Sequence, residues 1–127
     1  RAAMSGYYYR QMIEHIKNIL ADPKSVYPDY NEKEGYEVAG FAWFQGWNDM
    51  VDGGVYPNRY KEGGYGLYSE LLTKFIREVR KDIKAPDMPF VIGVMGTGGA
   101  TAKYSSPQYK GVHQNFRDAM GAPANLK

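Results

Sequence analysis

The sequence predicts an α/β fold in which a parallel β-sheet lies between two layers of helices. Two short runs, at residues 37–45 and 89–95, carry apolar residues at successive positions, as expected for strands that are covered on both faces. Helical periodicity precedes, separates and follows these runs, so the element order is helix, strand, helix, strand, helix. Strands that alternate with helices pair in parallel through crossover connections, which predicts a three-layer α/β/α sheet.

Three segments have the spacing of amphipathic helices. From Ser5 to Ala21 apolar residues recur every three or four positions, with Ser5 placed to cap the start and Pro23 to end the segment. Residues 67–84 carry the most regular apolar stripe, formed by Leu71, Leu72, Phe75, Ile76, Val79 and Ile83. The last helix is built on apolar residues four positions apart and closed by a glycine and a proline, namely Val112, Phe116, Met120, Gly121 and Pro123.

The connections between these elements differ in character. Residues 22–36 are polar and proline-containing, as is typical of a surface connection. Residues 50–66 are rich in glycine and form a long loop, a length that is usually either functional or disordered, and we expect a functional loop. Two strands do not complete a doubly wound sheet, which normally has about five. We therefore expect residues 1–127 to form one partial domain, the middle of a larger one.

Composition and charge exclude several classes of protein. Sixteen Lys and Arg residues against fourteen Asp and Glu residues leave a net charge of +2 without a basic block, so we expect neither a nucleic-acid nor a membrane partner. The chain has no cysteine, which excludes disulfides and thiolate metal sites. No apolar run approaches the roughly 18 residues that span a bilayer.

Polar chemistry follows directly on the first predicted strand, in the stretch "GFAWFQGWNDMVDGG" at residues 40–54. In open α/β sheets ligands bind outside the carboxyl ends of the strands, and both this stretch and the glycines at 96–99 fall there. Gly46 allows the backbone to leave the strand sharply, and Asn48 can then direct its amide toward a developing negative charge. This arrangement is typical of an oxyanion hole.

The same residues carry a family resemblance. The tetrapeptide "GWND" is similar to the G-x-N-D third block of the SGNH hydrolases. The longer stretch "GFAWFQGWNDMVD", followed by "YSELLTKFIREVRKDIKAPDMPFVIGVMG", resembles the sialate O-acetylesterase and acetylxylan esterase branch, carbohydrate esterase family 6. The resemblance covers most of the chain and implies a flavodoxin-like α/β/α fold.

The resemblance implies roles for five adjacent residues. Asn48 would be the side-chain donor of the oxyanion hole, a catalytic role. Gln45, Gly46 and Trp47 would bind substrate, with Gln45 in the family's W-x-Q-G segment. Asp49 would orient the loop by accepting hydrogen bonds from backbone N–H groups. Trp47 departs from the pattern, because many relatives carry Glu at this position.

Two parts of the family's catalytic machinery are absent from the chain. Its nucleophile lies in a G-D-S-like first block, and no serine here has that context; the serines are Ser5, Ser25, Ser69, Ser105 and Ser106. Its base lies in a D-x-x-H block, and neither His15 nor His113 has an aspartate three residues before it. The nucleophile and base therefore lie outside this chain, and residues 1–127 alone should be inactive.

The expected function is that of a carbohydrate O-acetylesterase, with an acetylated carbohydrate as partner. It needs no cofactor, and no metal site is expected because His15 and His113 are far apart in the sequence without a third ligand. The resemblance implies a secreted or periplasmic location and leaves the sugar open. A non-catalytic carbohydrate-binding or structural relative of the same fold is the alternative.

Several of these residues also have a simpler, structural interpretation. Asn48 and Asp49 also suit a turn cap, since both side chains bond readily to nearby backbone. Trp43 and Phe44 suit the core or a pocket wall, whereas Trp47 lies beyond the strand and could face a sugar. The glycines at 96–99 are similar to a phosphate-binding loop, but the full G-x-G-x-x-G pattern is absent.

Overall fold

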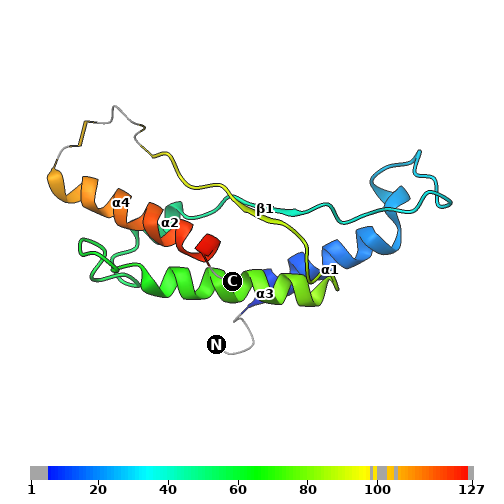
Figure 1. The fold of residues 1–127 in the computed structure, drawn as a ribbon, viewed down its shortest axis with the longest axis horizontal. Coiled ribbons are helices and arrows are strands. Elements are labelled where there is room, and N and C mark those ends of the chain that lie inside the picture. The colour runs from blue at the N-terminus through cyan, green and yellow to red at the C-terminus, as the bar shows by residue number, and fades with distance from the viewer. Residues whose placement is uncertain (1–5, 98, 100–102, 105, 126–127) are drawn as a thin grey trace. The chain divides into compact units, whose positions relative to one another are not determined.

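The structure is a computed structural model that describes residues 6–97, 99, 103–104 and 106–125. Its elements follow the predicted order with one short helix in addition (Figure 1). In chain order they are α1 Tyr7–Ala21, the 3-10 turn Pro23–Ser25, β1 Phe41–Trp43, α2 Trp47–Val51, α3 Gly66–Asp82, β2 Phe90–Ile92, α4 Pro107–Gly121 and the 3-10 turn Ala122–Asn125. The expected Ser5 cap and part of the glycine-rich segment after residue 96 lie outside the described residues.

The chain divides into two compact units. The first comprises Arg1–Ala39 and Arg77–Met88, and the second comprises Gly40–Ile76 and Pro89–Lys127. Helix α3 contributes its last turns to the first unit and the rest of its length to the second. Both strands, α2 and α4 belong to the second unit, and so do all the predicted site residues.

In the first unit, a hydrogen bond links α1 to the last residue of α3. Helix α1 begins after Gly6, whose φ of 70° lies in the left-handed region that glycine adopts readily. Ile13 is its buried residue. The Tyr9 hydroxyl donates to Asp82 Oδ2 at 2.7 Å, which joins the middle of α1 to the end of α3.

Helix α3 ends at Asp82, two residues before the predicted end, in a Schellman motif. Lys84 has a φ of 58°, the left-handed conformation that stops a helix. The N–H group of Ala85 donates to the Arg80 carbonyl at 2.9 Å, and that of Lys84 donates to the Lys81 carbonyl at 3.1 Å. These two bonds satisfy carbonyls that have no partner inside the helix.

The two strands pair in parallel, which confirms the predicted adjacency and direction. Phe41 lies opposite Phe90, and Trp43 lies opposite Ile92. The N–H group of Gly93 extends the ladder by donating to the Trp43 carbonyl at 2.8 Å. Each strand is only three residues long, so both predicted runs were too long, because apolar composition alone does not mark where hydrogen-bonded pairing stops.

Within the described residues the strand pair is covered on one face, and the predicted cover of the second face stays a prediction. On the covered face Phe75 of α3 packs against Trp43, with ring centres 4.5 Å apart. On the other face Phe44, just beyond β1, is 77% exposed and Val91 is 62% exposed, so Phe44 lies outside the core that the described residues form. No described element of the second unit packs over these side chains to remove them from solvent.

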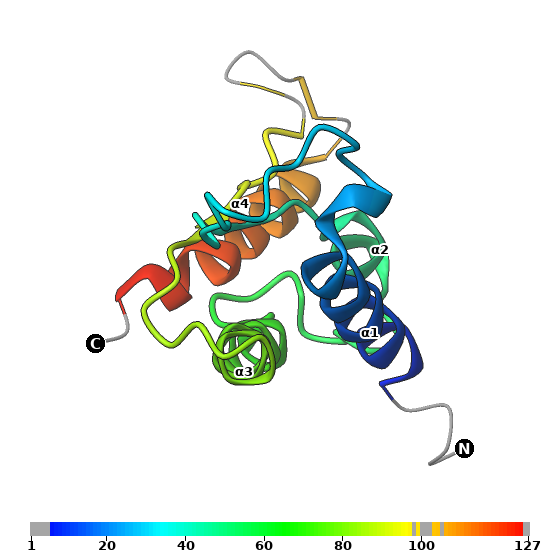
Figure 2. The ribbon, with the colours of Figure 1, turned by 90° about the vertical axis from the view of Figure 1, so that its right-hand side faces the viewer.

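The core of the second unit is aromatic and centred on Phe116 of α4, which is fully buried. The rings of Tyr65 and Tyr68 lie 4.8 and 4.7 Å from it, measured between ring centres. The Ser69 hydroxyl donates to the Ala119 carbonyl at 2.8 Å. Helix α4 therefore lies beside the first turns of α3, as both views show (Figures 1 and 2).

The connection predicted at residues 50–66 is ordered and begins inside α2, which ends at Val51. The Asp52 carboxylate accepts hydrogen bonds from the backbone N–H groups of Gly54 and Val55 at 2.8 and 3.0 Å, which forms a tight turn. From α4, the amide of Asn115 donates to the carbonyls of Arg59 and Lys61 at 3.1 and 2.9 Å. Helix α4 thus holds this loop as well as the core.

The same substitution at Phe116 and at Phe44 should have very different effects on residues 1–127. Phe116→Ala removes a fully buried ring and should lower the free energy of unfolding by about 3–5 kcal/mol. Phe44→Ala, at a ring that is 77% exposed, should change it by less than about 0.5 kcal/mol. Chemical denaturation of both variants measures the difference, and equal losses would contradict the described packing.

Candidate functional site

The candidate site begins where β1 ends and the backbone turns into the short helix α2. Gln45 and Gly46 form the bend, and the Met50 N–H group donates to the Gly46 carbonyl at 2.9 Å as the first turn closes. The sequence predicted a sharp turn here but no helix. A helix of five residues, Trp47–Val51, is too short to give a periodic pattern that could be recognised in the sequence.

Gly46 lies where α4 approaches closely, which leaves no room for a side chain. The residue is buried, and a Cβ atom at this position would lie 2.6 Å from Cε1 and 2.9 Å from Cζ of Phe116. No side chain fits in that space without moving the ring. The predicted substrate contact of Gly46 is therefore limited to what its backbone can offer.

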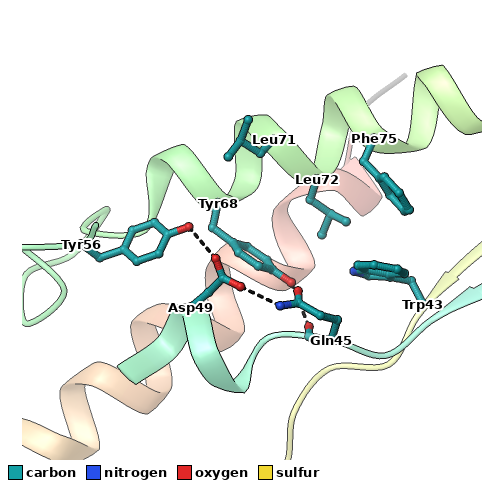
Figure 3. A pocket seen from close by; sticks show the side chains of 8 residues that line it. All are labelled: Trp43, Gln45, Asp49, Tyr56, Tyr68, Leu71, Leu72 and Phe75. Atoms are coloured by element: carbon teal, nitrogen blue, oxygen red, sulfur yellow. Dashed lines mark hydrogen bonds between the residues drawn. The ribbon is translucent and has the colours of Figure 1, made fainter. Parts of the chain in front are cut away.

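The Asp49 carboxylate accepts hydrogen bonds from two side chains. Gln45 Nε2 donates to Oδ2 at 2.7 Å, and the Tyr56 hydroxyl donates to Oδ1 at 3.0 Å (Figure 3). The Tyr68 hydroxyl donates to the Gln45 carbonyl at 3.0 Å and completes the network. The donors to Asp49 in this structure are therefore side chains rather than the expected backbone N–H groups.

Asn48 and Trp47 occupy the first turn of α2 and are exposed. The Trp47 ring is 54% exposed. The Asn48 carbonyl accepts from the Asp52 N–H group at 3.1 Å, which helps to close the helix. No hydrogen bond joins the Asn48 side-chain amide to any residue that the structure describes, and the residue is exposed.

A cavity of about 240 Å³ lies beside this network, between β1, α2 and α3 (Figure 3). Its walls are aromatic and aliphatic, with two polar residues, and are formed by Trp43, Gln45, Asp49, Tyr56, Tyr68, Leu71, Leu72 and Phe75. Of the predicted site residues only Gln45 and Asp49 line it. Trp47 and Asn48 are exposed and do not line the cavity, and Gly46 is buried. The predicted site residues therefore lie in three different environments.

The sequence analysis missed the tyrosines that surround α2. Tyr56, Tyr65 and Tyr68 are each at most 5% exposed, and burial raises the pKa of all three hydroxyls. The proximity of Asp49 raises the pKa of Tyr56 and Tyr68 further, since a negative charge disfavours a second one. The only signal in the sequence was a concentration of tyrosine and glycine between residues 56 and 68.

The two histidines belong to different units of the chain. His15 is exposed on α1, whereas His113 of α4 is half-buried with its ring 5.2 Å from that of Tyr104. Within residues 6–97, 99, 103–104 and 106–125, no group of three or more His, Asp or Glu side chains is placed to hold a metal ion. Over the same residues, no helix has the length and apolar character needed to cross a bilayer.

Comparison with known proteins identifies the family. A family model described as "carbohydrate esterase, sialic acid-specific acetylesterase" matches residues 2–124, nearly the whole chain. The chain belongs to this acetylesterase family. The resemblance that the motif around Asn48 indicated is thereby confirmed at the level of the family. No curated protein and no solved structure matches the chain.

The buried tyrosines of this acetylesterase-family chain should ionise late in an alkaline titration. Burial raises the pKa of Tyr65 and Tyr68 to about 12, and the pKa values of Tyr9 and Tyr56 are raised as well. Unfolded tyrosines ionise near pH 10. The buried tyrosines therefore make their full contribution to the free energy of unfolding below about pH 10, and this contribution is lost as the pH rises through about 12.

Ultraviolet absorbance of tyrosinate, followed together with circular dichroism, measures this effect. We expect two stages of ionisation, the later one accompanied by unfolding, and a smaller late stage in Tyr65→Phe and in Tyr68→Phe. A single stage near pH 10 in the folded protein would contradict the described burial.

Proposed function

We propose that this chain supplies the oxyanion-hole block of a serine esterase of the SGNH type that removes acetyl groups from carbohydrates. The observation that carries the proposal is the position of Asn48, on an exposed helical turn directly after β1, with an amide that bonds to no described residue. Membership in a carbohydrate esterase family supports the class of reaction. The reaction needs no cofactor.

The chemistry assigns a defined step to Asn48. A serine oxygen attacks the acetyl carbonyl carbon while the serine proton passes to the histidine, and the carbonyl π electrons move to the carbonyl oxygen, which becomes an oxyanion. The Asn48 amide donates a hydrogen bond to this oxyanion, together with two backbone N–H groups from other blocks of the domain. The bond to the sugar oxygen then breaks, the sugar leaves with a proton from the histidine, and water releases acetate from the serine.

The neighbouring residues serve substrate binding. Trp47 presents an exposed ring beside Asn48 and offers an apolar surface to one face of a sugar. Gln45 lies at the wall of the cavity, where its amide is held by Asp49. Gly46 contributes its backbone only, and Asp49 orients the segment through its bonds to Gln45 and Tyr56.

The catalytic site belongs to a larger domain in this proposal. Further strands and helices of a flavodoxin-like α/β/α domain cover the sheet face that carries Phe44 and Val91. The exposed apolar side chains on that face, 77% and 62% exposed, support this arrangement, because contiguous apolar surface is usually covered by a neighbouring element. The nucleophile and base come from that larger domain. A non-catalytic carbohydrate-binding relative of the same fold is the competing function.

Residues 1–127 alone should not hydrolyse p-nitrophenyl acetate faster than buffer. The hydroxyls of Ser25 and Ser69 donate to backbone carbonyls, and Ser106 caps α4. No hydrogen bond joins any of these three serines to His15 or His113 in the described residues, so none of the three is an activated nucleophile. The full-length protein in the same assay is the control. Turnover that disappears on mutation of a serine in this chain would contradict the proposal.

In the full-length protein, Asn48→Ala should lower kcat roughly a hundred- to a thousandfold. KM should hardly change, because the amide meets negative charge mainly in the transition state. Asn48→Asp should be worse, since a carboxylate removes the donor and adds like charge. Steady-state kinetics on an acetylated sugar measures both variants, with melting temperatures to confirm equal folding.

The ranking of the two variants separates catalysis from capping. A turn cap only accepts hydrogen bonds from backbone, so Asp would then serve as well as Asn. An active Asp variant beside an inactive Ala variant would therefore refute the oxyanion role. Asn18→Ala, at an exposed asparagine of α1, is the matched control and should leave kcat unchanged.

A further inference from the structure

Helix α2 cannot hold its own conformation, because five residues form little more than one turn. Initiating a helix is unfavourable, and the carbonyls of the last turn have no partners inside the helix. Donors from outside must therefore fix it. In this structure the donors come from the loop that follows α2 and from the start of α3.

Three tyrosine hydroxyls hold the segment at its start, middle and end. Tyr68 donates to the Gln45 carbonyl at 3.0 Å, and Tyr56 donates to the Asp49 carboxylate at 3.0 Å. Tyr65 donates to the Met50 carbonyl at 2.6 Å. A fourth donor, Arg59 Nη1, reaches the Val51 carbonyl at 2.6 Å.

The three rings are themselves immobilised, so their hydroxyls act from fixed positions. Tyr65 is fully buried, and Tyr56 and Tyr68 are 3% and 5% exposed. Tyr65 and Tyr68 pack on Phe116, and the rings of Tyr56 and Tyr65 lie 5.0 Å apart between centres. A tyrosine side chain has few rotatable bonds, so a packed ring directs its hydroxyl with little freedom.

Between these anchored points lies Asn48, whose own side chain is exposed. Its amide is therefore positioned only through the backbone of α2. We propose that Tyr56, Tyr65 and Tyr68 form a tyrosine clamp that positions Asn48 for the chemical step. This inference rests on the proposed function of Asn48 as the oxyanion donor. The three tyrosines touch no reacting atom and act through α2.

A double-mutant cycle in the full-length protein tests the clamp. Tyr65→Phe and Tyr68→Phe keep the buried ring and remove only the hydroxyl, so the fold should be preserved. Each should lower kcat on the order of tenfold with KM nearly unchanged, since a small displacement of a catalytic group is costly. In an Asn48→Ala background the same substitutions should have almost no further effect, because the group that they position is gone.

Tyr60→Phe is the matched control. Tyr60 lies in the same loop and is 42% exposed, and its hydroxyl accepts from Arg59 rather than bonding to α2. It should leave kcat unchanged in both backgrounds. Amide hydrogen exchange supplies a readout that does not depend on catalysis. Residues 45–51 should exchange faster in Tyr65→Phe than in Tyr60→Phe.

The outcomes distinguish the clamp from the proposed function. If Asn48→Ala is impaired but the clamp variants retain full kcat, the clamp is refuted and the proposed function stands. If Tyr65→Phe lowers kcat by the same factor with and without Asn48, the clamp is also refuted, because the effect of Tyr65 would then not depend on Asn48. If Asn48→Ala retains full activity, the proposed function fails and the clamp's catalytic role fails with it. Faster exchange and a loss of kcat that requires Asn48 support the proposal.

Discussion

The contact between Gly46 and the ring of Phe116 is the constraint on which the second unit depends. A Cβ atom at position 46 would lie 2.6 Å from that ring, so α4 can approach the end of β1 only because the residue is glycine. Once Phe116 occupies this place, the rings of Tyr65 and Tyr68 pack on its sides. This placement of Phe116, and the aromatic packing around it, therefore requires a residue without a side chain at position 46.

The same core determines the local structure of the candidate site. A helix as short as α2 would be marginal in isolation. Its exposed carbonyls are satisfied by side chains that the core immobilises, notably Tyr65 at Met50 and Tyr68 at Gln45, next to α2. The packed side chains of the core thus hold the backbone of the exposed helix α2. Helix α2 can in this way present Asn48 to solvent without losing its backbone geometry.

How far the fold could be predicted depends on the range of the interactions involved. The periodic stripe of α3 and the parallel pairing of β1 with β2 follow from patterns of hydrophobic residues, and the structure confirms both. The patterns of hydrophobic residues did not predict where the strands end or that Phe44 is exposed. An apolar run indicates which residues favour burial, but only the elements present in space decide whether Phe44 is covered, and here it is 77% exposed.

The sequence by itself determined the element order, the family and the cluster of candidate residues around Asn48, because these depend on residue type and on neighbours along the chain. Tertiary structure alone decided which partners those residues have. The Asp49 carboxylate binds Tyr56, seven residues away, and the Gln45 carbonyl binds Tyr68, twenty-three residues away. No local pattern encodes such pairs, because the packing of α3 and α4 around a common core is what brings the rings to α2.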